Sequence, residues 1–122
     1  MNPSLAGKVV IVTGASSGVG EAAARAFAKH GAVVVLAARS VDKISTLAKA
    51  IAGVAVPTDV SQLGDLRNLV ETTVARCGRI DVVVNNAAAN ARGTLDTLDP
   101  DAITAVIDTN LKAPLLLTRL FS

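Results

Sequence analysis

The chain contains no tyrosine, no tryptophan and only two phenylalanines among its 122 residues. No phenol hydroxyl is therefore available anywhere in this chain for proton transfer. The single cysteine, Cys77, excludes an intramolecular disulfide and is typical of a protein from a reducing compartment. The first residues also lack the basic-then-apolar layout of a signal peptide, so we expect a cytoplasmic protein.

Long apolar runs and an excess of one charge are also missing. No run approaches the ~20 residues of a membrane span, so we expect no membrane partner. Twelve basic and ten acidic residues give a net charge of +2. This balance is too even for a nucleic-acid-binding surface. Hydrophobic residues make up 51% of the chain, which excludes a disordered protein and predicts one domain over residues 1–122.

Four short valine-rich runs are the clearest structural signal. Each is continuous rather than alternating, as expected for parallel strands that are covered on both faces. The expected strands are Lys8–Thr13, Val33–Ala38, Val54–Pro57 and Asp81–Asn85. Segments with helical spacing lie between and after them, at Val19–His30, Val41–Ile51, Gln62–Cys77 and from about Asp101 onward. This alternation predicts right-handed crossovers and a doubly wound α/β fold.

The third helical segment shows which face should pack on the sheet. Its apolar side chains recur at three- and four-residue spacing. They are Leu63, Leu66, Leu69, Val70, Val74 and Cys77. Gly31, just after the first helical segment, stands where a C-terminal cap is expected.

A glycine-rich turn directly follows the first expected strand. Residues 13–20 are Thr-Gly-Ala-Ser-Ser-Gly-Val-Gly, and helical sequence follows. Glycines allow close backbone approach, and free amides at a helix start attract phosphate. The predicted cofactor-binding residues here are Gly14, Ser16, Ser17, Gly18, Val19 and Gly20. The alternative is a turn that binds nothing; a Walker-type loop is excluded because no Gly-Lys-Ser/Thr follows.

The spacing Thr-Gly-x-x-x-Gly-x-Gly resembles the signature of the short-chain dehydrogenase/reductase family. The resemblance extends to Asp59-Val60, to residues 85–88 (Asn-Asn-Ala-Ala) and to Asn110, and covers the chain from Gly7 to about Arg119. It implies a Rossmann-type sheet with strand order 3-2-1-4 in these four units. It also implies hydride transfer between a nicotinamide cofactor and a carbonyl or alcohol carbon.

The end of the second expected strand bears on the choice of cofactor. In dinucleotide-binding folds an acidic residue about twenty positions after the glycine turn holds the ribose of NAD, whereas an arginine accommodates the 2′-phosphate of NADP. Arg39, followed by Ser40, stands at this position, and no carboxylate does. The sequence therefore favours NADP(H) over NAD(H), with Arg39 and Ser40 as contacts. The alternative for Arg39 is a solvated loop residue. Some NADP-dependent family members carry a basic residue where this chain has Ser17.

Polar residues follow the third and fourth expected strands. The resemblance implies that an aspartate and the next amide contact adenine, and that the asparagine pair lies near the cofactor ribose. The residues concerned are Asp59, Val60, Asn86, Ala87 and Ala88. Ala88 stands where the family has glycine. As alternatives, Asp59 can be a helix N-cap, for which Ser61 is better placed, and the paired asparagines can form a turn.

Most catalytic residues of the family are missing. The resemblance implies that Asn110 kinks the last helix and binds a water of the proton relay. The family's general acid/base is the tyrosine of Tyr-x-x-x-Lys, and a serine polarises the substrate oxygen, but this chain has no tyrosine. Because a proton donor must lie within hydrogen-bond reach of that oxygen, we expect the chain alone to be inactive. No metal site is expected.

Two functions stay open at this point. The first is an NADP-dependent oxidoreductase of small carbonyl or alcohol substrates, present as its cofactor-binding half and truncated before the catalytic half. The second is a non-catalytic nucleotide-binding or interaction module that ends naturally at Ser122. The first is favoured, because the last helical segment has no capping glycine and ends within its apolar face. The fourth strand then forms an uncovered apolar edge, which predicts a homo-oligomer.

Overall fold

Four parallel strands form one sheet in the order β3-β2-β1-β4. The structure, a computed structural model, describes residues 5–16, 18–87, 100, 101, 104 and 120. The strands are β1 (Val9–Thr13), β2 (Val33–Ala38), β3 (Val54–Pro57) and β4 (Val82–Val84). The predicted α/β fold and strand order are confirmed. Almost all of the last expected helix, including Asn110, lies outside the described residues.

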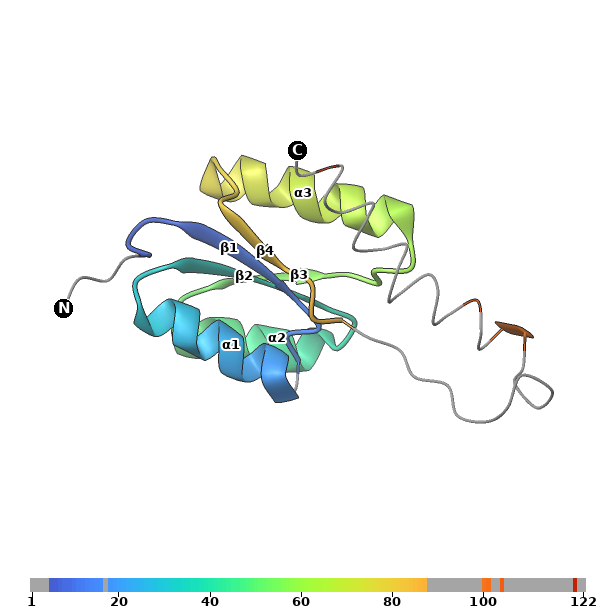
Figure 1. The fold of residues 1–122 in the computed structure, drawn as a ribbon, viewed down its shortest axis with the longest axis horizontal. Coiled ribbons are helices and arrows are strands. Elements are labelled where there is room, and N and C mark those ends of the chain that lie inside the picture. Colours follow the sequence, from blue (N-terminus) through green and yellow to red (C-terminus); the bar gives the residue numbers. More distant parts are fainter. Residues whose placement is uncertain (1–4, 17, 88–99, 102–103, 105–119, 121–122) are drawn as a thin grey trace.

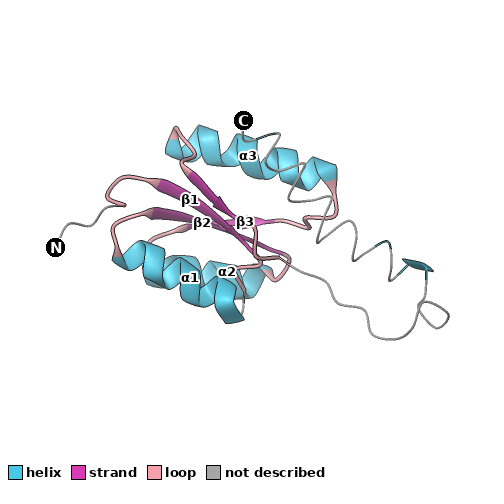
Figure 2. Ribbon diagram, in the orientation of Figure 1, coloured by secondary structure: helices cyan, strands magenta, loops and turns pink. Residues whose placement is uncertain are grey.

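Within residues 5–87, of which only Ser17 is not described, three helices cover the two faces of this sheet. They are α1 (Gly18–Lys29), α2 (Val41–Ile51) and α3 (Leu63–Cys77). Helices α1 and α2 lie on one face and α3 on the other, so the sheet is the middle layer (Figures 1 and 2). Successive side chains of a strand point to opposite faces. Val10 and Val12 accordingly pack with the core on the α1–α2 side, and Val9 and Ile11 with the core on the α3 side. This is why the strand sequences are continuously apolar.

The buried face of α3 differs in part from the prediction. The predicted residues that do pack against the sheet are Leu66, Leu69, Val70 and Cys77. Leu63 and Val74 are instead 40% and 48% exposed, because they lie at the sides of the buried stripe. Thr73 takes a fully buried position on that stripe. Its hydroxyl donates to the Leu69 carbonyl at 2.7 Å, so this buried polar group has a partner. A search for apolar residues alone does not identify Thr73 as a core residue.

Residues with positive φ end the helices. Gly31 has φ 92° and its N–H donates to the carbonyl of Ala28 at 3.0 Å, so the expected cap of α1 is confirmed. Helix α2 ends instead in Ala52, whose φ of 54° costs a residue with a side chain roughly 1–2 kcal/mol. The glycine comes one residue later, because a Cβ on Gly53 would lie 2.7 Å from the carbonyl oxygen of Val34.

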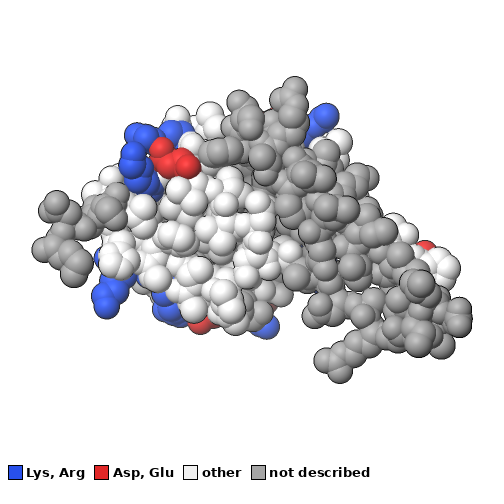
Figure 3. Space-filling model, viewed as in Figure 1, with Lys and Arg blue, Asp and Glu red and all other residues white. Residues whose placement is uncertain are grey.

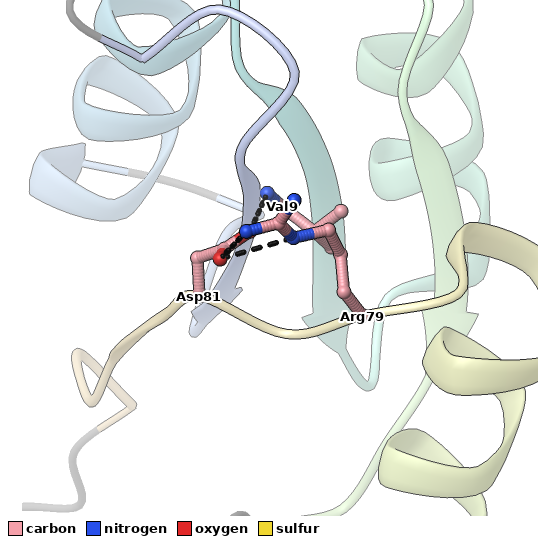
Figure 4. A network of polar contacts seen from close by, with 3 residues as sticks. All are labelled: Val9, Arg79 and Asp81. Carbon is pink, nitrogen blue, oxygen red and sulfur yellow. Dashed lines mark hydrogen bonds and ion pairs between the residues drawn. The ribbon is translucent and has the colours of Figure 1, made fainter.

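At the amino ends of the strands, Asp81 joins the start of β4 to β1 (Figure 4). Its Oδ2 accepts the N–H of Val9 at 2.8 Å, and its own N–H donates to the Val9 carbonyl at 2.9 Å. Arg79 donates from Nη2 to the Asp81 Oδ1 at 2.6 Å. This bond with Arg79, followed by the bond from Val9, lowers the pKa of Asp81 below its usual value. The side chain of Asp81 thus replaces a strand contact, and β4 begins at Val82 rather than at Asp81.

Candidate functional site

The glycine turn lies where β1 and β4 end next to each other. Gly14 has φ 62°, and a Cβ on it would lie 2.8 Å from the Cα of Ala87. A Cβ on Gly20 would collide with the carbonyl oxygen of Gly14 and would lie 2.5 Å from Nδ2 of Asn86. Only glycine therefore allows the turn, the start of α1 and the loop after β4 to pack this closely.

Gly18 has different surroundings from the other two glycines of the turn. It begins α1 with φ 58°, and no atom lies within 4 Å of the place that a Cβ would occupy. The next residue, Val19, is 76% exposed. The first amides of a helix have no partner within it, and such amides beside open space suit a phosphate group. The residues present therefore fit the pyrophosphate of a dinucleotide.

Thr13 anchors the turn to β4 and was not assigned a role from the sequence. Its hydroxyl donates to the Val84 carbonyl at 3.3 Å, and accepts the N–H groups of Asn86 at 2.9 Å and of Ala87 at 3.1 Å. The side-chain amide of Asn86 in turn donates to the carbonyl of Gly14 at 3.2 Å. A hydroxyl residue as the last residue of an otherwise apolar strand is the sequence feature that could have indicated this role for Thr13.

Arg39 and Ser40 lie at the neighbouring strand end. Both are exposed and directly follow β2. Ser40 precedes α2 but its hydroxyl makes no capping hydrogen bond, so it can donate to a ligand. The N–H of Ala15 donates to the carbonyl of Ala37 at 3.4 Å, which ties the glycine turn to the end of β2. The turn and Arg39 thus occupy the carboxyl ends of adjacent strands, the usual place for ligands in open α/β sheets.

An open cleft of about 550 Å³ extends from the glycine turn between α1 and α2. Its lining residues are Ser16, Gly18, Glu21, Arg25, Asp42, Lys43, Thr46 and Leu47. Arg25 and Glu21 form an exposed ion pair with 3.4 Å between Nε and Oε2. The cleft therefore carries both signs of charge. Over the described residues on the face in Figure 3, basic and acidic groups likewise lie in small clusters near the periphery.

The loop between β3 and α3 is held by its own polar groups. Oδ1 of Asp59 accepts the N–H of Ser61 at 3.0 Å and its hydroxyl at 2.7 Å. The Ser61 hydroxyl is the largest cause that lowers the pKa of Asp59, and the charge of Arg39 lowers this pKa further. The N–H of Asp59 donates to Oδ2 of Asp65 at 2.8 Å.

The expectation that Asp59 or Ser61 caps α3 is wrong. The N-cap residue is Gln62, and no side chain makes a capping bond there. The physical reason is that α3 begins at Leu63, so Asp59 and Ser61 lie before the cap position, and Oδ1 of Asp59 accepts its bonds from Ser61 within the loop.

The structure brings most of the predicted site residues to one edge of the sheet. Those placed at the ends of β1 and β4 are Gly14, Ser16, Gly18, Val19, Gly20, Asn86 and Ala87; those at the ends of β2 and β3 are Arg39, Ser40, Asp59 and Val60. Ser17, Ala88 and Asn110 lie outside the described residues. Within the part of the chain that the structure describes, no three His, Cys, Asp or Glu residues come together as metal ligands. No helix in that part is long and apolar enough to cross a membrane.

Comparison with known proteins gives one family. The family model for short chain dehydrogenases matches residues 8–122. An uncharacterised oxidoreductase of Listeria innocua is 42% identical over 113 residues, which cover 88% of this chain and 46% of that protein. A ketoacyl reductase of a Nostoc species is 39% identical over 122 residues, which cover 96% of this chain and 42% of that protein. The chain thus spans about half the length of the curated relatives it matches.

Solved structures agree with the family match. A metagenomic short-chain oxidoreductase in complex with NADP superposes with a TM-score of 0.90 at 42% identity, covering 97% of this chain and 56% of that one. The 3-ketoacyl-(acyl-carrier-protein) reductase of Brucella melitensis, complexed with NADH, superposes with a TM-score of 0.89 at 34% identity. The superposition covers 95% of this chain and 49% of the Brucella chain.

Proposed function

The chain belongs to the short-chain dehydrogenase/reductase family, and from this premise we propose that it forms the NADP(H)-binding part of an oxidoreductase. The proposed reaction of the whole protein is hydride transfer between the nicotinamide and the carbonyl or alcohol carbon of a small substrate. One observation supports the proposal. Close contacts of Gly14 and Gly20 hold the glycine turn against the loop after β4, and Gly18 in this turn faces open space. Arg39 directly follows the neighbouring strand β2.

Each part of the cofactor has residues that suit it. The free amides at the start of α1, around Gly18, would hold the pyrophosphate. The loop of Asp59 and Val60 would contact adenine, as the family resemblance implies. Ser16 and the backbone at Ala87 would lie beside the riboses. The nicotinamide supplies or accepts the hydride when it is bound; this chain's residues hold and orient the nucleotide.

Arg39 supports NADP(H) rather than NAD(H). Relatives are known with either cofactor, so family membership does not decide the question. An exposed guanidinium at the end of β2, next to the free hydroxyl of Ser40, suits a 2′-phosphate. A bare ribose hydroxyl would gain much less from this cation, because it carries no charge.

The test is a calorimetric titration of the chain with NADP⁺ and with NAD⁺. We expect Arg39→Ala to weaken NADP⁺ binding by about tenfold, or about 1.4 kcal/mol, the low end for hydrogen bonds to charged groups because the site is exposed. Affinity for NAD⁺ should not change. Arg67→Ala, an exposed arginine on α3, is the charge-matched control. Equal effects of Arg39→Ala on both cofactors would show that Arg39 is only a solvated loop residue.

The cytoplasmic location and the homo-oligomeric state stay proposals. Among the described strands, β4 pairs with β1 alone, and a strand edge without a partner can pair with a strand of another chain. Sedimentation of the chain at tens of micromolar tests self-association, and a stable monomer would contradict it.

A further inference from the structure

Asp65 makes a contact that its place in a helix does not explain. It lies in the first turn of α3, where an acidic residue usually stabilises its own helix through the helix dipole. Its Oδ2 instead accepts the backbone N–H of Asp59, six residues earlier in the chain, at 2.8 Å. The half-buried carboxylate of Asp65 therefore reaches back into the loop that follows β3.

This contact completes a set of bonds around Asp59. The N–H of Asp59 is held by Asp65, its carbonyl accepts the N–H of Gln62 at 3.0 Å, and its carboxylate accepts both donors of Ser61. Every polar group of Asp59 thus has a partner within the loop or at the start of α3. The loop is also tied to the sheet next to it, since the N–H of Thr58 donates to the carbonyl of Ala38 at 2.9 Å.

We propose that Asp65 is a positioning residue of the nucleotide site, which fixes the Asp59–Val60 loop before a ligand binds. The inference rests on the proposed function, because it takes this loop to meet the adenosine part of the cofactor. Asp65 itself does not touch the ligand. A loop that is already ordered loses less conformational freedom on binding, so the bond from Asp65 strengthens nucleotide affinity indirectly.

Three substitutions in the full chain separate the hydrogen bond from the charge. Asp65→Ala removes the acceptor and the charge, whereas Asp65→Asn removes the charge but keeps an acceptor oxygen at the same place. Glu71→Ala removes an exposed acidic side chain from the same helix, away from the loop, and is the matched control. If Asp65→Ala does not fold, Asp65→Ser is measured in its place, because its hydroxyl is too short to reach the Asp59 amide.

Two measurements are made on each variant: hydrogen exchange of the Asp59 amide, and the dissociation constant of adenosine 2′,5′-bisphosphate. We expect Asp65→Ala to speed the exchange and to weaken binding, each by about tenfold, equivalent to about 1.4 kcal/mol. Asp65→Asn should keep most of the protection of the Asp59 amide and most of the affinity. Glu71→Ala should change neither the exchange rate nor the affinity.

Each contrary result has a separate meaning. Unchanged exchange in Asp65→Ala, or faster exchange with undiminished affinity, would overturn the positioning role and leave the proposed function intact. If the unsubstituted chain does not bind the bisphosphate, the proposed function fails and this role fails with it. The exchange data would still show whether Asp65 holds the loop.

Discussion

The hydroxyl oxygen of Thr13 and the backbone nitrogen of Asn86 lie 2.9 Å apart, and this contact joins the end of β1 to the loop after β4. The same hydroxyl accepts a second N–H from Ala87 and donates to the carbonyl of Val84. A hydroxyl has one donor and two acceptor lone pairs, so its whole bonding capacity is used. One side chain that is 2% exposed therefore anchors both sides of the candidate site.

Replacing Thr13 by valine should destabilise the chain although the side chain keeps its shape. The substitution leaves the N–H of Ala87 without its partner, and leaves the N–H of Asn86 and the carbonyl of Val84 with only their 3.1 Å bond to each other. A buried unsatisfied group costs about 1–3 kcal/mol. Since these groups are only partly buried, we expect a loss of about 2 kcal/mol in the free energy of unfolding, measured in urea. Thr13→Ser should retain most of the stability. Thr72→Val, whose hydroxyl bonds only to exposed Asn68, is the control; equal losses in both valine variants would contradict the anchoring role.

Gly20→Ala should be destabilising, whereas Gly64→Ala should not. The added methyl at position 20 collides with the carbonyl oxygen of Gly14 and displaces the amide of Asn86. Gly64 also lies in a helix, but nothing lies within 4 Å of its Cβ position, so alanine there should raise stability by about 0.5 kcal/mol. Thermal unfolding of the two variants tests this, together with nucleotide titration. A Gly20→Ala variant as stable as Gly64→Ala would show that the turn can move away from α1.

Asp81 should make stability depend on acid pH. Its pKa in the folded chain is lowered, chiefly by the hydrogen bond from Arg79 and then by that from Val9. The stabilisation is therefore fully present above the unfolded pKa of about 3.9, and is lost as the pH falls through that value toward the lower folded pKa. We expect Asp81→Asn to flatten the dependence of the free energy of unfolding on pH below about pH 5. Asp42→Asn is the charge control, and the same flattening in it would point to net charge rather than to this network.

The chain alone should show no NADPH-dependent reduction of a broad panel of ketones. It contains no tyrosine, and the family resemblance gives the proton transfer to a tyrosine. The measurement is NADPH oxidation by a preparation of verified mass. Turnover above background would mean that another group of this chain donates the proton.

Much of the fold could be predicted because it depends on patterns that are local in the sequence. The valine runs predict the four strands, but Lys8, Asp81 and Asn85 are wrongly included in them. Asp81 bonds through its side chain to Val9, which no run of apolar residues reveals. On α3, Thr73 is buried in place of Val74, because its hydroxyl is satisfied within its own helix.

The candidate site could be predicted less completely. The glycines, Arg39 and Asn86 stand out by spacing after a strand, and the structure places them at one edge of the sheet. Thr13 was missed as an anchor because its partner lies 73 residues away in the sequence. In the sequence, Asp65 is an ordinary acidic residue of a first helical turn, and only the structure shows that it accepts the N–H of Asp59.

The strand order also determines when the site can form during folding. β1 is paired on one side with β2, close in sequence, and on the other with β4, which follows two further strands and three helices. Closing so long a loop costs chain entropy and slows folding, so β1–β4 pairing should form later than the local contacts of the glycine turn. The local contacts of the glycine turn should therefore form before the candidate site, which also needs β4 beside β1. If the chain binds nucleotide as proposed, recovery of this binding after dilution from denaturant should follow the pairing of β1 with β4 rather than the formation of the turn.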